Sequence, residues 1–255
     1  MQKLTPIELN EICDELGEAR PKSVKKVHGG DIHSTWQIEF ANKKFFLKRN
    51  DRNKKLLKFE KFCLQNLRMF ISQENLLIPE VIAYKDIKNI EILLIEWIDM
   101  KNFDQKRLGK GLGEMHLNST EANPKNFGYP VEGFIGLTNQ KKGWEKNWTD
   151  CFLNLRIIPQ LSILKSNVLN KETINKVIGK IKLELINHNP VNTLVHGDLW
   201  SGNIGIDKNG KGVIFDPASW WADNEVDIAM TKLFGGFRKE FYEEYHKIIP
   251  IKKGF

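Results

Sequence analysis

The feature that most constrains this chain is the segment His-Gly-Asp-Leu-Trp-Ser-Gly-Asn at residues 196–203. It follows an apolar run that is typical of a buried strand, and it places Asp198 and Asn203 five positions apart. Further on, two short apolar runs flank an Asn-Gly pair at 209–210, which is a strong hairpin signal. The second run ends at Asp216. The hairpin is therefore expected to fold the chain back and to bring Asp216 beside Asn203.

This spacing is that of the catalytic loop in kinase-like phosphotransferases. In such a loop the Asp, here Asp198, accepts the proton of the attacking hydroxyl, and the Asn, here Asn203, holds a magnesium ion on the nucleotide phosphates. Asp216 is the expected second metal ligand, because Mg²⁺ prefers oxygen ligands. The alternative is that Asp198 and Asp216 are ordinary turn residues. Their joint spacing, with a hairpin between them, favours an enzyme that uses ATP and Mg²⁺.

The N-terminal half has the parts that such an enzyme needs to bind its nucleotide, in the expected order. Gly29 and Gly30 lie between two expected strands and would permit close backbone approach to phosphate. A third strand ends at Lys48, whose cation would grip the phosphates. A Gly-Gly pair is often a plain turn and a lysine at a strand end is often solvated, so both assignments rest on position. The five expected strands cover residues 24–28, 32–40, 45–47, 81–84 and 91–95.

A helix is expected over residues 53–70, because apolar residues recur there at helical spacing. Glu60 lies in its central turns and is the candidate partner that would hold Lys48 against the phosphates; a solvated helix carboxylate is the alternative. The fifth strand runs into Glu96 and Ile98. This segment is expected to be the hinge between two lobes, where backbone groups can bind adenine.

Length and composition agree with a two-lobed enzyme. The chain has 255 residues, and 41% of them are hydrophobic, which is typical of a globular protein with a substantial core. The expected fold is α+β and protein-kinase-like. Residues 1–98 would form a nucleotide-binding lobe, an antiparallel sheet with one helix, and residues 99–255 a mainly helical lobe for catalysis and acceptor binding. Helices are expected at 103–118, 144–165 and 171–188.

Several other classes of protein are disfavoured. The N-terminus has no apolar signal region and no uncharged apolar run reaches the length of a membrane span, so neither secretion nor a membrane is expected. Three scattered cysteines fit a reducing cytoplasm and give no metal site. The net charge of +7 comes from lysines spread along the chain. It predicts a solvated surface that favours an anionic nucleotide, and no nucleic-acid partner is expected.

The chain resembles the fructosamine-3-kinase, or ketosamine kinase, family. Residues 196–203, Phe-Asp-Pro-Ala-Ser at 215–219 and Phe-Gly-Gly-Phe at 234–237 carry the resemblance. It extends over nearly the whole chain, through Gly-Gly-Asp-Ile at 29–32 and the Gly-Leu-Thr-x-Gln and Trp-x3-Trp region at 136–148. Aminoglycoside and choline phosphotransferases share the fold and the Asp-x4-Asn spacing. The Leu-Trp-Ser-Gly and Asp-Pro-Ala-Ser segments are more specific to the ketosamine kinases.

The resemblance implies ATP-dependent phosphorylation of the 3-hydroxyl of a ketosamine, which is a sugar joined to an amine by glycation and rearrangement. The 3-phosphate product breaks down and frees the amine, so the activity would be deglycation repair. The acceptor would be a small ketosamine or a glycated protein, and the enzyme a monomer or weak dimer. Trp200 is expected to pack against the sugar face, with core packing as the alternative. By similarity to kinase-like folds, Asp227 is expected to brace the catalytic loop.

Two alternatives stay open. One is a kinase-fold enzyme for another hydroxylated acceptor, such as an aminoglycoside or an amino alcohol of the choline type. The other is an inactive relative, because the chain ends at Phe255, where members of the family are expected to continue into further helices. A C-terminal lobe that is short in this way would expose apolar surface.

Overall fold

An antiparallel sheet forms the N-terminal half of the protein. In the computed structural model its strands are β1 (Ser23–Lys26), β2 (Ser34–Glu39), β3 (Lys44–Asn50), β5 (Val81–Ile87) and β6 (Ile90–Glu96), in the order β1-β2-β3-β6-β5. The structure describes residues 4–27, 32–41, 43–52, 54–101, 104–122, 124–164, 170–250 and 252. All five strands expected from the sequence are present, although most run one to three residues longer or shorter than expected.

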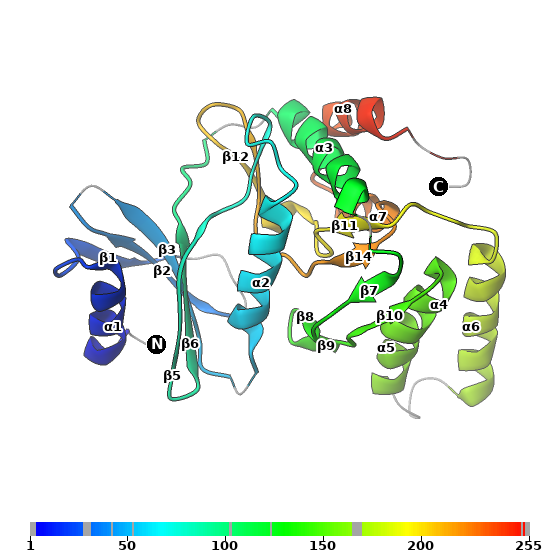
Figure 1. The fold of residues 1–255 in the computed structure, drawn as a ribbon, viewed down its shortest axis with the longest axis horizontal. Helices are drawn as coiled ribbons and strands as arrows, with labels where there is room; N and C mark the ends of the chain where they lie inside the picture. The colour runs from blue at the N-terminus through cyan, green and yellow to red at the C-terminus, as the bar shows by residue number, and fades with distance from the viewer. Residues whose placement is uncertain are drawn as a thin grey trace.

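Two helices lie against this sheet, on opposite faces (Figure 1). Helix α2 (Leu56–Arg68) matches the expected helix and lies on the side of the C-terminal half. Helix α1 (Pro6–Leu16) was not expected. It begins with a capping box, in which the Thr5 hydroxyl accepts from the Glu8 amide and the Glu8 carboxylate accepts from the Thr5 amide. Glu8 also pairs with Arg49 at 2.8 Å, which fastens α1 to β3.

Helices make up most of the C-terminal half, as expected. They are α3 (Lys106–Ala122), α4 (Trp148–Phe152), α5 (Ile158–Ile163), α6 (Lys171–Leu185), α7 (Glu225–Leu233) and α8 (Lys239–Ile248). The single helix expected at 144–165 is divided, because a π-helical turn (Leu153–Ile157) joins α4 to α5. Pro159 lies in the first turn of α5 and has no N–H to donate to the carbonyl of Leu155, so a regular α-helix is interrupted at this point.

A small antiparallel sheet lies among these helices and was missed by the sequence analysis. Its strands are β10 (Gly143–Glu145), β7 (Phe127–Tyr129), β14 (Trp220–Ala222) and β11 (Thr193–Val195), in that order. A separate hairpin consists of β8 (Gly133–Ile135) and β9 (Thr138–Gln140). The segment 127–140 therefore contains three strands. Each has only three residues, which is too short for a period of two to be recognised.

The hairpin expected around Asn209 is confirmed by β12 (Ile204–Ile206) and β13 (Gly212–Ile214). Its turn is held by Asp207, whose carboxylate accepts from the backbone amides of Asn209 and Lys211, both at 2.8 Å. β13 also pairs in parallel with β4 (Leu76–Leu77) from the N-terminal half. The hairpin that ends at Asp216 is thus fixed to both halves of the molecule.

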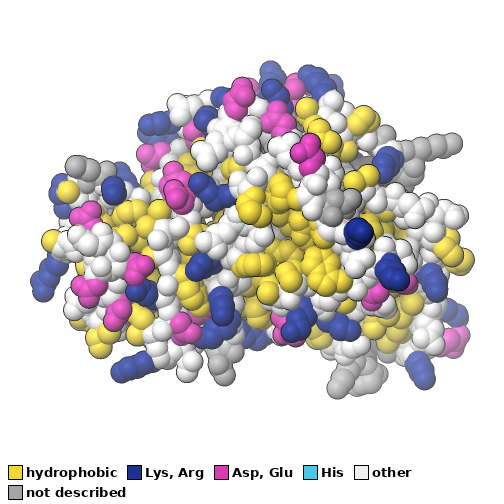
Figure 2. Space-filling model, viewed as in Figure 1, with side chains coloured by type: hydrophobic (Ala, Val, Ile, Leu, Met, Phe, Trp, Pro, Cys, Tyr) yellow, Lys and Arg dark blue, Asp and Glu magenta, His cyan; other side chains and the backbone are white. Residues whose placement is uncertain are grey.

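The hydrophobic core runs through both halves. One cluster joins buried side chains of α2 and β6 to those of α3, α4 and α8, and a second lies between α1 and the N-terminal sheet. On the face drawn in Figure 2, lysine and arginine side chains are scattered among acidic ones, and hydrophobic side chains gather near the middle. Within the described ranges, no helix is long and apolar enough to cross a membrane.

Candidate active site

A cavity of about 410 Å³ lies between the N-terminal sheet and the loop that follows β11. The N-terminal half contributes Lys48 from β3 and Glu60 from α2, and the β8–β9 hairpin contributes Phe134 and Gly136. The predicted site residues that line it are Lys48, Glu60, Asp198, Trp200, Asn203 and Asp216. Lys48 and Asp216, which are 168 positions apart in the sequence, therefore share one cavity.

Lys48 lies at the centre of a buried ion-pair cluster. It is inside β3 and not at a strand end, because its neighbours Thr35 and Leu93 pair with it from both sides. Its ammonium lies 2.7 Å from Glu60 Oε1, as expected from the sequence, and also pairs with Asp216 Oδ1. The second contact was not expected. Lys48 thus joins the sheet and α2 to the end of the β12–β13 hairpin.

The charges in this cluster depend on one another. Burial alone would lower the pKa of Lys48, but the carboxylates of Asp216 and Glu60 raise it, so the ammonium stays charged. Burial also acts to raise the pKa of Asp216, yet the adjacent Lys48 holds that pKa below its usual range. For Glu60 burial prevails and raises the pKa to about 7, against the opposing effect of Lys48. Glu60 is therefore the member of the cluster that changes charge near neutral pH.

Asp198 and Asn203 lie side by side in the cavity. Asn203 Nδ2 donates to the Asp198 carbonyl at 2.8 Å and to Asp198 Oδ2 at 3.1 Å, and a short 3-10 helix (Ser201–Asn203) gives the loop its shape. Burial raises the pKa of Asp198, although His196 and Asn203 oppose this effect. The second carboxylate oxygen of Asp198 has no such donor within the described residues, and Asp198 lines the cavity.

Asp216 is brought beside Asn203, as the hairpin predicts. The Phe215 amide donates to the Asn203 carbonyl at 3.1 Å. Asp216 has a φ of +57°, a left-handed conformation that is uncommon for a residue other than glycine. Such backbone is retained where surrounding contacts over-determine it, often at functional sites. The conformation directs the Asp216 carboxylate into the cavity, toward Lys48.

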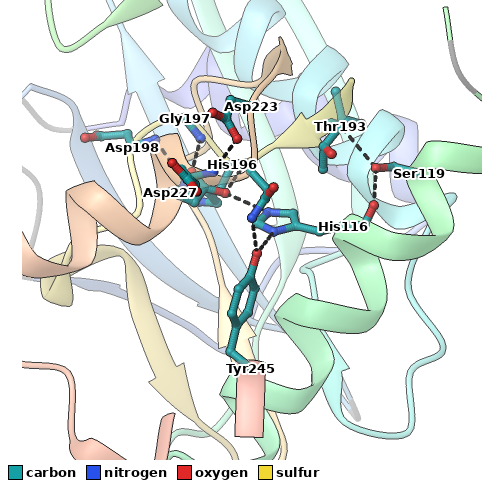
Figure 3. A network of polar contacts seen from close by, with 12 residues as sticks. His116, Ser119, Thr193, His196, Gly197, Asp198, Asp223, Asp227 and Tyr245 are labelled. Atoms are coloured by element: carbon teal, nitrogen blue, oxygen red, sulfur yellow. Dashed lines mark hydrogen bonds and ion pairs between the residues drawn. The ribbon is translucent and has the colours of Figure 1, made fainter. Parts of the chain in front are cut away.

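Asp227 braces the catalytic loop from behind, as predicted. It lies on α7, is fully buried, and accepts hydrogen bonds from the backbone amides of His196 at 2.7 Å and Gly197 at 2.8 Å. His116 on α3 donates to the same carboxylate at 3.1 Å, and Tyr245 on α8 contacts the other ring nitrogen of His116. Figure 3 shows this cluster on one side of the loop and the Asp198 carboxylate pointing away from it.

His196 holds the loop through its ring. Its Nε2 donates to the Phe215 carbonyl at 2.9 Å, and its Nδ1 accepts from the Asp198 amide at 3.3 Å. Burial lowers the pKa of His196, so the imidazole is neutral and matches this pattern of one donor and one acceptor. Because both ring nitrogens make contacts within the loop, His196 braces the loop and has no free nitrogen for a reacting proton.

Trp200 forms an exposed wall of the cavity, and 38% of its surface is accessible. Its ring lies over Gly202, where a Cβ would collide with it, and it meets Phe234 edge-on at 6.0 Å between ring centroids. Gly236, from the same Phe-Gly-Gly-Phe segment, has a φ of +89°, and a Cβ there would lie 2.5 Å from Ser201. The missing side chains of Gly202 and Gly236 therefore let the Phe-Gly-Gly-Phe segment pack directly on the catalytic loop.

Some predicted residues are not brought into the cavity. Glu96 ends β6 with an exposed side chain that accepts from the Glu80 amide at 3.3 Å, and Ile98 is half-buried beyond it. Neither lines the cavity, so an adenine-binding role for this segment would have to rely on backbone groups outside it. Gly29 and Gly30 lie outside the described residues, and their role stays a prediction.

His33 also lines the cavity, although it was not expected from the sequence. His33 comes directly before β2, and its Nδ1 is enclosed without a hydrogen-bond partner among the described residues. Burial and the charge of Lys48 lower its pKa to about 4, so the ring is neutral. His33 has no recognisable spacing to the other site residues, and no sequence signal would have identified it.

The oxygen atoms at the loop are compatible with a magnesium ion. The Asn203 side chain uses its Nδ2 toward Asp198, which leaves its carbonyl oxygen available, and Asp216 has one carboxylate oxygen beyond the one paired with Lys48. A carboxylate and an amide carbonyl are hard donors that suit Mg²⁺ with water and phosphate oxygens. The arrangement therefore combines a carboxylate, a fixed cation and two oxygen donors that suit a metal ion in one cavity.

The fold is that of the protein-kinase-like small-molecule phosphotransferases. A crystal structure of an aminoglycoside phosphotransferase with ADP and hygromycin B matches it with a TM-score of 0.59 and 14% identity, over 87% of this chain and 75% of that one. A sequence model of the fructosamine kinase family matches residues 7–255, and the chain belongs to this family. Fold and family together define an ATP-dependent phosphotransferase with an alcohol group as acceptor.

Individual relatives agree with this assignment. A protein of Vibrio parahaemolyticus described as a "probable ketoamine kinase" is 34% identical over 234 residues, which cover 90% of this chain and 79% of the relative. A crystal structure from Haemophilus somnus, provisionally named a fructosamine-3-kinase, has a TM-score of 0.85 and 25% identity. It covers 96% of this chain, and this chain covers 83% of it.

Proposed function

We propose that this protein transfers the γ-phosphoryl group of ATP to the 3-hydroxyl of a ketosamine and so starts the release of the glycated amine. The observation that carries the proposal is the position of Asp198. Asp198 lines the same cavity as Asn203, Asp216 and Lys48, and one of its carboxylate oxygens has no hydrogen-bond donor among the described residues. The membership in the fructosamine kinase family supports ketosamines as the acceptor class.

Asp198 is the proposed base. A hydroxyl becomes a better nucleophile as its proton moves to a positioned carboxylate, and the oxygen that Asn203 leaves free would accept that proton. The Asn203 amide keeps the carboxylate in one rotamer, and Asp227 and His196 keep the loop backbone in place. Trp200 at the cavity edge would pack against the sugar, because an aromatic face suits the C–H face of a sugar ring.

Lys48 is the proposed phosphate ligand, and Glu60 keeps it in position. The Lys48 ammonium pairs with Asp216, and a phosphate would compete for that contact. Gly29 and Gly30 are proposed to cover the phosphates, and the backbone of Glu96 and Ile98 to bind adenine. The two lobes, 1–98 and 99–255, would then meet around the nucleotide.

Asn203 and Asp216 are the proposed Mg²⁺ ligands. When bound, the ion would neutralise charge that develops on the transferred phosphoryl group. The cavity volume of about 410 Å³ is in the range for a small-molecule ligand and supports a small ketosamine, or the glycated side chain of a protein, as acceptor.

A coupled ATP turnover assay tests the proposal. We expect turnover that depends on added ribulose-lysine or fructose-lysine and on Mg²⁺. The product should carry the transferred phosphate on its 3-hydroxyl. Kanamycin and choline serve as comparison acceptors because related folds act on such alcohols. Turnover with one of these and none with either ketosamine would reject the acceptor class, and no turnover with any acceptor would favour an inactive relative.

Glu60→Gln is expected to raise the KM for ATP by about tenfold, because a neutral amide holds the Lys48 ammonium less firmly than a carboxylate does. Since the pKa of Glu60 is raised to about 7, the difference from the parent enzyme should be largest above that pH and shrink below it, where Glu60 is protonated. Steady-state kinetics between pH 6 and 8 measures this. Glu11→Gln on the exposed face of α1 is the control, and a pH-independent difference would contradict the assignment.

A further inference from the structure

Arg156 has an unusual backbone setting. It lies in the π-helical turn between α4 and α5, and π-turns are frequent at functional sites. The Leu155 carbonyl has no N–H partner from Pro159, and Arg156 Nη1 donates to it at 2.9 Å. The same nitrogen donates to the Lys141 carbonyl at 3.2 Å. Two backbone carbonyls therefore fix the guanidinium in one orientation.

The guanidinium of Arg156 stacks on an aromatic column. Its central carbon lies 3.9 Å from the centroid of the Trp220 ring. Trp220 in turn stacks on Trp148, and Trp148 on Phe152, with interplanar angles of 27° in both pairs. Stacking of this kind holds the plane of a guanidinium while its edge stays available for hydrogen bonds.

Arg156 lacks the partner that a half-buried arginine usually has. Within the described part of the chain it forms no ion pair with a carboxylate, whereas the buried Arg49 pairs with both Glu8 and Asp51. Burial lowers the pKa of Arg156 to about 10, so it stays charged at neutral pH. A charge that is partly removed from water and not neutralised is costly unless an anion joins it.

The outer edge of the guanidinium is open. Both recorded hydrogen bonds use Nη1, and none is made by Nε or Nη2 to any described residue. Among the described residues, neither Nε nor Nη2 of Arg156 is a fully enclosed polar atom without a partner. Both nitrogens are therefore accessible to solvent. These two nitrogens form the fork that binds a carboxylate or phosphate with two parallel hydrogen bonds.

Arg156 lies beside the elements that line the active-site cavity. Trp220, on which it stacks, pairs with Val195 directly before the catalytic loop, and a Cβ at Gly197 would lie 3.3 Å from the Trp220 ring. Lys141 follows the β8–β9 hairpin, whose Phe134 lines the cavity. Arg156 does not itself line the cavity, but it lies between two elements that do, the loop of Asp198 and the β8–β9 hairpin.

We propose that Arg156 binds an anionic group of the acceptor, a carboxylate on its amine part or a phosphate on its sugar part. The proposal rests on the proposed function, because it assigns a preference among ketosamines. Charged ketosamines, such as glycated free amino acids, are then bound more tightly than neutral ones. The π-turn would contribute to this preference, since the Leu155 and Lys141 carbonyls hold the guanidinium in one orientation.

Two matched pairs of acceptors test this. Nα-acetyl-ε-fructosyl-lysine and its methylamide differ only by a carboxylate, and fructosyl-butylamine with and without a 6-phosphate differ only by a phosphate. The parent enzyme should have a lower KM for the anionic member of at least one pair, and the pair that shows it identifies which end of the acceptor Arg156 binds. Arg156→Gln should raise that KM by about 10- to 100-fold and change the KM of the neutral member by no more than about twofold.

Arg156→Lys should recover part of the preference, because the charge is kept and the fork is lost. Lys142→Gln removes one charge next to Lys141 and is the matched control, for which all KM values should stay the same. Equal KM values within both pairs in the parent enzyme would overturn the proposal, even if Arg156→Gln fails to fold. An equal rise for all acceptors in Arg156→Gln would also overturn it. Absence of turnover with all four acceptors would instead reject the proposed function.

Discussion

Asp198→Asn is expected to lower acceptor-dependent ATP turnover by about 10²- to 10⁴-fold and to leave the fold intact. The Asn amide has the same shape, and its oxygen can still accept the hydrogen bond that Asn203 Nδ2 gives to Asp198 Oδ2 at 3.1 Å. It has no basic oxygen that could take the proton of the acceptor hydroxyl. The loss should therefore appear in kcat, with little change in the KM for ATP, because no role in nucleotide binding is assigned to Asp198.

The pH dependence of the parent enzyme gives a second readout for the same residue. Burial raises the pKa of Asp198 above the ordinary value of an aspartate, which is about 3.9. The base must be ionised to accept a proton, so kcat/KM should fall as the pH falls through this raised pKa. The residual activity of Asp198→Asn should lack this acidic limb. A pH–rate profile of both proteins, corrected for any loss of fold by circular dichroism, measures the difference.

Asp14→Asn on the exposed face of α1 is the control for the removal of one negative charge. It should have the turnover and the pH profile of the parent enzyme. Equal turnover in Asp198→Asn and the parent enzyme would remove Asp198 from the role of the base. Loss of turnover together with a large rise in the KM for ATP would instead indicate that Asp198 acts on the nucleotide.

The parts of the site that could be predicted are those encoded in short spacings. Asp198 and Asn203 are separated by one turn of loop, and the Asn-Gly hairpin returns the chain to Asp216 over a fixed distance. The contact of Lys48 with Glu60 joins a strand to the helix that comes next in the sequence. In each case local geometry, which the sequence pattern records, determines which side chains meet.

Other parts of the site depend on contacts that no local pattern records. His116 and Asp227 are 111 positions apart, and they meet only because α3 packs against α8 and against β11, the strand before the catalytic loop. Arg156, the proposed anion ligand, is oriented by a π-turn next to Pro159, which has no N–H, in a segment whose apolar spacing predicts an ordinary helix. The contact of Lys48 with Asp216 arises where the two halves meet. Tertiary packing, not propensity, decides all three.

Asp227→Asn is expected to lower the free energy of unfolding by about 3 to 5 kcal/mol, because it disrupts a fully buried polar cluster. Both carboxylate oxygens accept from the catalytic loop, Oδ2 from the His196 amide and Oδ1 from the Gly197 amide, and Oδ2 also accepts from His116. An Asn side chain has only one acceptor oxygen. In either orientation its NH₂ group would therefore face a backbone N–H, and one donor would be left without a partner.

The same change should reduce kcat in the fraction of the protein that stays folded, by about tenfold or more, because a displaced loop backbone moves Asp198 away from its position. Urea unfolding measures the change in stability. The change in kcat is measured separately, without urea and at a temperature where the variant is folded. Tyr245→Phe is the matched variant, since its hydroxyl contacts His116 at 2.9 Å and not the loop. It should cost about 1 to 2 kcal/mol and leave kcat close to that of the parent enzyme.

Acid unfolding provides an independent check of Asp227. Burial acts to raise its pKa, but His116, His196 and the Gly197 amide together hold the pKa below the usual range. A carboxyl group whose pKa is lower in the folded state stabilises the fold above its unfolded pKa, about 3.9, and this contribution is lost as the pH falls through the folded pKa. The parent enzyme should therefore lose more stability than Asp227→Asn between neutral pH and strongly acidic pH. If Asp227→Asn were destabilised but kept the full kcat, Asp227 would support the fold and not the position of the catalytic loop.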